Sequence, residues 1–281
     1  MISGIKLAKN SRDFFNPTQS LQAQHQHTCS NMADLLSGAV DSSVHQIDNS
    51  QNTADSAAKI EIKVMRPRAP IALVFADGER RADDSVDSAM ENFGQGFGRR
   101  LPVLIFGNKT SITSRAEEFK KIMEVMKHCN SRGGRGMGGK VAISCEKKSI
   151  KQLVPISYPL RKHSELQDAE LLALSPWLNV IFISGDRDHL LGIDELDAVR
   201  EKMKAQTWRV IVRQADHSMH MMPDEGTEAI GMEVGVIVAE WLLQRENNRE
   251  GELRWNDNNM QVEWSGWVPF LPLTKFQFRT V

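Results

Sequence analysis

The segment GGRGMGGKVA at 133–142 contains a glycine spacing that fits two motifs with different chemistry. Gly134, Gly136 and Gly139 spell G-x-G-x-x-G, the pattern of a dinucleotide-binding loop whose backbone approaches a pyrophosphate. The same stretch also fits a G-x-S-x-G nucleophile elbow in which Gly136 stands where the reactive serine would be. The first interpretation predicts a cofactor, and the second predicts a hydrolytic fold without its nucleophile.

A dinucleotide-binding loop needs a buried strand directly before it, a helix after it, and an acidic residue about 20 residues further on that holds the ribose. The residues before the glycines, HCNSR at 128–132, are polar and do not predict a strand. The later segment LVPISYP has no carboxylate at its end, and two apolar segments that predict buried strands already precede the glycines. The sequence therefore favours the elbow, with nucleotide binding kept as an alternative.

A nucleophile elbow is followed along the chain first by an acid and then by a histidine base, each placed after a later strand. Asp186 and Asp188 come directly after the apolar segment NVIFIS, and His217 follows the next apolar segment, TWRVIV. An aspartate in such a place also commonly forms a turn. The order of these residues nevertheless predicts that Gly136, one of the two aspartates and His217 lie together.

The elements that would position these residues alternate between strand and helix. Several strands are continuous apolar runs, which is typical of a parallel sheet covered on both faces. The predicted fold class is therefore α/β, a three-layer sandwich with a mostly parallel sheet. Strands are expected at 58–64, 71–75, 101–106, 152–160, 179–184 and 207–212, and helices at 86–97, 115–128, 140–147, 164–174, 193–203 and 228–244.

Composition divides the chain into three parts. Residues 1–57 are rich in Ser, Gln, Asn and His without periodicity, which predicts a disordered tail, and Met32 within it is an alternative start to Met1. Residues 58–245 form the predicted domain. Residues 246–281 are expected to form a hairpin and tail, in which NDNN is the turn and three tryptophans close an edge of the domain or bind a partner: Trp255, Trp264 and Trp267.

The overall charge and the cysteines exclude several classes of function. The 281 residues are 41% apolar and 25% charged with a net charge of −1, so no global field attracts nucleic acid or an anionic membrane. No apolar run approaches the roughly 20 residues that span a bilayer. Cys29, Cys129 and Cys145 form no spaced pair, which favours a reducing compartment, cytoplasmic or nuclear, and predicts no metal site.

Together these motifs resemble the α/β-hydrolase-like family that includes testis-expressed protein 30 and the third subunit of the non-specific-lethal histone-acetyltransferase complex. Its proteins carry an H-G-A-G-G loop, a G-G-R-S-M-G-G-R elbow, a Y-P-L segment, a G-x-R-D acid turn and a D-H-S base loop. This chain has GGRGMGGK at 133–140, SYPL at 157–160, SGDRD at 184–188 and ADHS at 215–218. The resemblance runs from about residue 71 to residue 241.

The resemblance implies a role for each position of the motifs. Asp186 becomes a turn former, because the acid of the family is the second aspartate of G-x-R-D. Acyl transfer needs a nucleophilic oxygen, which a glycine at the nucleophile position does not offer. The implied site positions are Gly136 for the nucleophile, Asp188 for the acid, His217 for the base, and Asp77, Gly78 and Met137 for the oxyanion loop.

The oxyanion loop also departs from the family pattern. FADGERR at 75–81 stands where the family has H-G-A-G-G, so that Asp77 replaces the histidine and Glu79, Arg80 and Arg81 replace small residues. The two carboxylates would place negative charge where an oxyanion develops, with the two arginines offsetting part of it.

With the nucleophile absent and the oxyanion loop altered, we expect a non-catalytic protein that binds a protein partner or a small ligand, without a cofactor. The alternative is a residual esterase that uses Asp188 and His217 with water. In that alternative a relocated nucleophile such as Ser144, Cys145 or Ser218 could also replace the serine.

Overall fold

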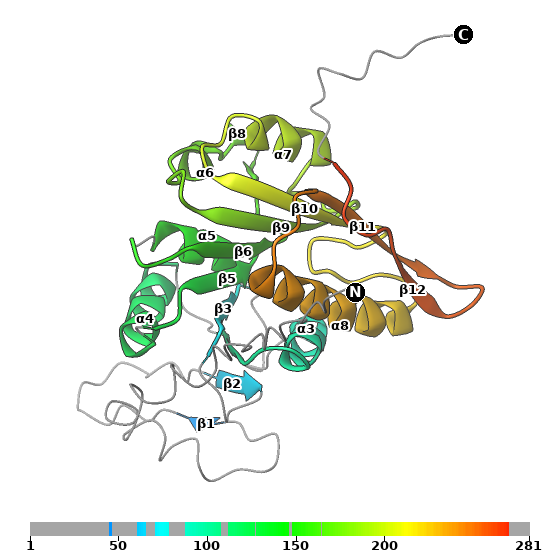
Figure 1. Cartoon of the computed structure of the whole chain (residues 1–281), viewed down its shortest axis with the longest axis horizontal. Helices are drawn as coiled ribbons and strands as arrows, with labels where there is room; N and C mark the ends of the chain where they lie inside the picture. Colours follow the sequence, from blue (N-terminus) through cyan, green and yellow to red (C-terminus); the bar gives the residue numbers. More distant parts are fainter. Residues whose placement is uncertain are drawn as a thin grey trace, which may run out of the picture. The chain divides into compact units, whose positions relative to one another are not determined.

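A ten-stranded β-sheet runs through the computed structural model, which describes residues 45–46, 61–65, 71–78, 88–107, 112–126, 128–145, 148–163 and 165–269 (Figure 1). All of them belong to one compact unit, Val44–Val281. The strands of this sheet are β1 (His45–Gln46), β2 (Glu61–Met65), β3 (Leu73–Asp77), β4 (Val103–Gly107), β5 (Ser131–Arg135), β6 (Gln152–Ile156), β9 (Asn179–Gly185), β10 (Gln206–Val212), β11 (Glu250–Asn256) and β12 (Gln261–Trp264).

The strand order places the ends of the central strands at one edge. The order is β1-β2-β4-β3-β5-β6-β9-β10-β11-β12, and the strands from β4 to β11 in this order are parallel. The pairs β1–β2, β2–β4 and β11–β12 are antiparallel. Because the carboxyl ends of parallel strands meet at the same edge, the residues that follow β3, β5, β9 and β10 are brought together there.

Helices cover both faces of the sheet. Leu73 and Phe75 of β3 pack into a core with α3 and α8, whereas Val74 and Ala76 pack into a second core with α4, α5 and α7. A strand buried on both faces needs apolar residues at successive positions, which explains the continuous apolar runs. The predicted α/β fold class is confirmed. The helices are α3 (Ser88–Gly98), α4 (Ile112–Val125), α5 (Met137–Ser144), α6 (Ala169–Leu172), α7 (Ile193–Arg200) and α8 (Asp224–Leu243).

Two of the element predictions are wrong. The residues before and within the glycine stretch form β5, whose five residues are all buried, although the sequence predicted no strand there. A Cβ on Gly133 would lie 2.4 Å from the carbonyl oxygen of Val154, so this strand packs through its backbone rather than through apolar side chains. The helix predicted at 164–174 is instead β8 (Glu165–Leu166), which pairs with β7 (Arg161–Lys162), followed by the four-residue α6.

The tryptophan hairpin is present and extends the sheet. β11 pairs with β10 on one side and with β12 on the other, and residue 253 lies opposite Trp264. The ring of Trp264 covers Gly251, where a Cβ would come within 1.9 Å of it. Apart from residues 45–46, the segment 1–57 lies outside the described residues, as does 270–281. Within the described part of the chain, no helix is both long enough and apolar enough to cross a membrane.

Candidate active site

A sharp turn joins β5 to α5 at Gly136. This residue has φ 53° and ψ −122°, a conformation that is strained for residues with a Cβ. Its amide donates a hydrogen bond to the carbonyl oxygen of Ile156 at 2.9 Å, and its carbonyl accepts one from the amide of Gly139 at 3.1 Å. The next residue, Met137, begins α5, which has no side-chain cap. This is the strand–turn–helix geometry expected of a nucleophile elbow.

The glycines beside this turn are required by backbone contacts. A Cβ on Gly134 would lie 2.2 Å from the carbonyl carbon of Gly138, and a Cβ on Gly138 would lie 2.1 Å from the carbonyl oxygen of Ala76. Although the strand that a dinucleotide loop needs is present after all, the packing of the turn accounts for both glycines. A Gly134→Val substitution therefore tests the fold rather than nucleotide binding.

Asp188 and His217 form a hydrogen-bonded pair. His217 Nδ1 lies 2.8 Å and 2.9 Å from the two carboxylate oxygens of Asp188, whose side chain is fully buried. The amide of Leu190 also donates to this carboxylate, at 2.8 Å. Since Nδ1–H donates to the carboxylate, the neutral imidazole presents Nε2 as a hydrogen-bond acceptor.

The free nitrogen of this imidazole faces the elbow. A Cβ placed on Gly136 would lie 3.5 Å from Nε2 of His217. The structure thus brings together the three positions that the sequence proposed for nucleophile, acid and base, and the position of the nucleophile carries no side chain. Asp186 lies in the neighbouring turn, where its carboxylate accepts from the amide of Gln214 at 2.6 Å.

Asp77 does not present a free negative charge to the oxyanion loop, contrary to the sequence-based expectation. Its side chain is almost completely buried and accepts hydrogen bonds from Nη2 and Nε of Arg135 at 2.9 Å and 3.1 Å. Nη1 of the same guanidinium donates to the carbonyl oxygen of Ser218 at 2.8 Å. Arg135 therefore joins the first loop, the elbow and the base loop. Sequence reasoning missed it, although its position next to Gly136 in the elbow motif was a signal.

The other oxyanion-loop positions lie against the elbow. A Cβ on Gly78 would come within 2.3 Å of the amide nitrogen of Gly138 and within 2.7 Å of that of Met137, so only glycine allows this approach. Glu79, Arg80 and Arg81 lie outside the described residues.

We expect Asp77→Asn to lower the free energy of unfolding by about 3–5 kcal/mol, because it leaves the fully buried guanidinium of Arg135 without its counter-charge. Asp186→Asn is the matched control, since this partly exposed carboxylate lies 3.5 Å from Arg213 and such a pair contributes about 1 kcal/mol at most. Urea unfolding curves measure both, and equal losses would contradict a structural role for the buried pair.

The structure does not place all three candidates for a relocated nucleophile near His217. Ser144 and Cys145 lie at the far end of α5, about 12 Å along its axis from the elbow. The hydroxyl of Ser144 donates to the carbonyl of Val141, and Cys145 is buried. Ser218 follows His217 directly, and its amide donates to Asp216.

One further histidine approaches the base. The ring of His189 lies edge-on to that of His217, with 6.0 Å between the centroids. It follows Asp188 in the acid turn, and sequence reasoning did not select it. Among the described residues, no three His, Cys, Asp or Glu side chains are grouped so as to hold a metal ion.

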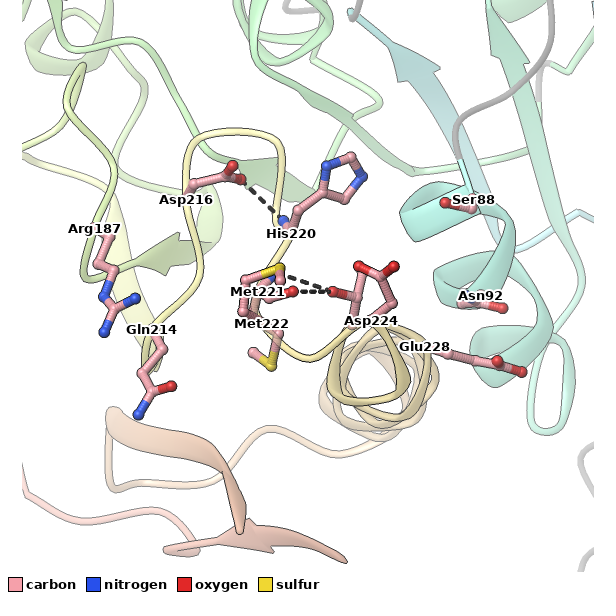
Figure 2. A pocket seen from close by; sticks show the side chains of 11 residues that line it. Ser88, Asn92, Arg187, Gln214, Asp216, His220, Met221, Met222, Asp224 and Glu228 are labelled. Carbon is pink, nitrogen blue, oxygen red and sulfur yellow. Dashed lines mark hydrogen bonds between the residues drawn. The ribbon is translucent and has the colours of Figure 1, made fainter. Parts of the chain in front are cut away.

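A pocket of about 620 Å³ lies beside the base loop (Figure 2). It is not the cleft expected over the elbow, because Gly136, Asp188 and His217 are absent from its lining. Asp216 and His220, which flank His217 along the chain, line this pocket, and the Asp216 carboxylate accepts from the amide of His220 at 2.9 Å. The α8 wall contributes Asp224 and Glu228.

The tyrosine of the SYPL segment is buried behind the elbow. Its hydroxyl donates to Glu170 at 3.2 Å, and the ammonium of Lys140 lies 5.6 Å from its ring centroid. Burial raises the pKa of Tyr158, and the neighbouring Glu170 raises this pKa further. The folded state therefore holds the phenolic proton more tightly than the unfolded chain, in which tyrosine titrates at about pH 10.

We expect the stabilisation from neutral Tyr158 to be complete below about pH 10 and to decline above it by up to about 1.4 kcal/mol per pH unit. Tyr158 is the only tyrosine in the sequence, so tyrosinate absorbance reports on this residue alone. The absorbance should rise together with unfolding, and Tyr158→Phe should flatten the alkaline part of the stability profile. Tyrosinate formation near pH 10 with the fold intact would contradict this prediction.

Comparisons with known proteins agree with this fold. Residues 108–233 match the model of a family described as an alpha/beta hydrolase domain. The esterase domain of a Rhodothermus marinus protein has a similar structure, with a TM-score of 0.52, 10% identity, and coverage of 71% of this chain and 96% of that chain. Est1E from Butyrivibrio proteoclasticus gives a TM-score of 0.51 with 11% identity, and 71% of this chain and 98% of that chain are covered.

An alpha-beta serine hydrolase homologue from Coxiella burnetii is also similar, with a TM-score of 0.50, 12% identity, and coverage of 73% of this chain and 97% of that chain. Identities this low show the fold and not the activity. The match to the family model and the similar solved structures show that this chain has the α/β-hydrolase fold.

Proposed function

We propose that this protein is a degenerate α/β hydrolase that forms no acyl-enzyme and acts by binding a small ligand or a protein partner at the retained site. The observation that carries the proposal is the absence of a side chain at Gly136, opposite Nε2 of His217. Covalent catalysis requires a nucleophilic side chain at this point, and no backbone group can replace it.

The motifs support a narrower assignment within the same proposal. We place the chain with the family that includes testis-expressed protein 30 and the third subunit of the non-specific-lethal complex, on the basis of its elbow, SYPL, acid-turn and base-loop segments. We also propose that it acts inside the cell, in the cytoplasm or the nucleus. Two of its cysteines, Cys129 and Cys145, are buried free thiols, which suits a reducing compartment.

Covalent labelling and ester turnover test this proposal. The purified full chain is incubated with a fluorophosphonate probe and, separately, with p-nitrophenyl esters, beside a His217→Ala control. The proposal expects no labelling and no ester turnover above the control. Labelling of the unmodified protein that His217→Ala abolishes would overturn it.

A residual hydrolase is the second candidate, because Asp188 and His217 keep the geometry of a working acid–base pair. The ion pair with Arg135 also removes the objection that Asp77 would repel an oxyanion. In this candidate Nε2 of His217 takes a proton from water as the water oxygen attacks the carbonyl carbon of a bound ester. The bond to the alcohol oxygen then breaks, and the imidazolium of His217 returns its proton to the leaving alcohol. Ester turnover that is lost in His217→Ala, without any probe labelling, would favour this candidate over the binding protein.

A further inference from the structure

The position beside Gly136 is open on the side that faces the base. Of the described residues other than its chain neighbours, only His217 Nε2 lies within 4 Å of a Cβ built on Gly136, at 3.5 Å. This distance is an ordinary van der Waals contact, so a small group fits next to the glycine. The side chain of His217 is 16% exposed, so part of it is accessible to solvent.

The surroundings select the kind of group that can enter. Nδ1 of His217 is committed to Asp188, so Nε2 of the neutral ring accepts a hydrogen bond, and the entering group must be a donor. On the other side lies the first turn of α5, which begins at Met137 without a side-chain cap, so its first backbone N–H groups have no acceptor within the helix. The entering group must therefore also accept hydrogen bonds.

A hydroxyl meets both demands, because it has one O–H donor and two lone pairs. An ammonium group donates but cannot accept, and the positive end of the α5 dipole disfavours its charge. A nitrile accepts but cannot donate. The site thus distinguishes three small groups of similar size by hydrogen bonding and charge.

We propose that the ligand of this protein carries an alcohol whose hydroxyl lies beside Gly136 and donates to Nε2 of His217, in place of the hydroxyl that a serine would supply. This inference rests on the proposed binding function and names the chemical class of the ligand. The substitution of serine by glycine then makes room for a group from outside the chain.

Nuclear magnetic resonance of the full chain with labelled histidine and glycine tests the inference with three two-carbon probes: ethanol, ethylammonium and acetonitrile. A ligand with three heavy atoms binds no tighter than about 1 mM, so each probe is titrated to about 1 M. Ethanol should give a saturable shift of His217 Nε2 and contacts from its methyl protons to the α-protons of Gly136. The other two probes should give neither.

Two variants at one position complete the test. Gly136→Ala places a methyl group in the space and should abolish the saturable ethanol response. Gly136→Ser has the same backbone strain but supplies its own hydroxyl, so its Nε2 resonance without ethanol should lie near that of the ethanol-saturated unmodified protein. An ethanol response that persists in Gly136→Ala, or that acetonitrile reproduces, would overturn the inference.

The two proposals fail in different ways. Fluorophosphonate labelling of the unmodified protein that depends on His217 would overturn the binding function, whatever the titration shows. Absence of labelling together with a linear, unsaturated ethanol response would leave the binding function standing and overturn only the alcohol ligand.

Discussion

Gly136→Ser is expected to convert the protein into one that reacts covalently with a fluorophosphonate probe. The new Cβ would lie 3.5 Å from Nε2 of His217, so its hydroxyl can reach hydrogen-bonding distance of a base already oriented by Asp188. The positive φ of Gly136 is strained for serine, yet nucleophile elbows hold their serine in such a strained turn. The buried pair of Asp77 and Arg135 leaves no free carboxylate at the start of the first loop.

The rate of labelling measures this restoration. Adding His217→Ala to Gly136→Ser should slow labelling by about 10²–10⁴-fold, the usual contribution of a general base. Gly136→Ala is the matched control, because it introduces the same strain without a hydroxyl and should not react. A Gly136→Ser protein that is folded, as judged by circular dichroism, but remains unlabelled would show that the altered first loop no longer stabilises an oxyanion.

Arg200→Met is expected to lower the free energy of unfolding by about 3–5 kcal/mol. Arg200 is fully buried and donates to Asp197 at 2.8 Å and to Glu250 at 2.6 Å. Arg209 bridges the same two carboxylates, so α7, β10 and β11 are joined by a network of four charges. Removing one guanidinium leaves two buried carboxylates with a single cation, and the hairpin strand β11 keeps only the link to α7 that passes through Arg209.

Arg100→Met is the matched control for Arg200→Met. Arg100 pairs with Glu240 at 2.8 Å, but both side chains are 53% exposed, and such a pair contributes about 1 kcal/mol at most. Urea unfolding monitored by tryptophan fluorescence measures both variants. Equal losses in the two would show that the buried network does not hold the hairpin.

The apolar pattern of the sequence was sufficient to predict the two strands that precede the acid and the base. NVIFIS and TWRVIV are β9 and β10, and Asp188 and His217 follow them as the chain order required. Both strands could be predicted because a central strand is buried on both faces, so its sequence is a continuous apolar run. The apolar pattern did not predict β5, because its sequence SRGGR is polar or glycine throughout. That strand packs by backbone contact and buries Arg135 in an ion pair.

The sequence by itself determined the fold class, the order of nucleophile, acid and base positions, and the absence of an oxygen at Gly136. All of these depend on residue type and on neighbours along the chain. Only the tertiary structure decided that Asp77 is neutralised by Arg135, that His189 approaches the base, and that the pocket beside the base loop excludes the elbow. The two residues of that ion pair are 58 positions apart, and their interaction arises because β3 and β5 are neighbours in the sheet.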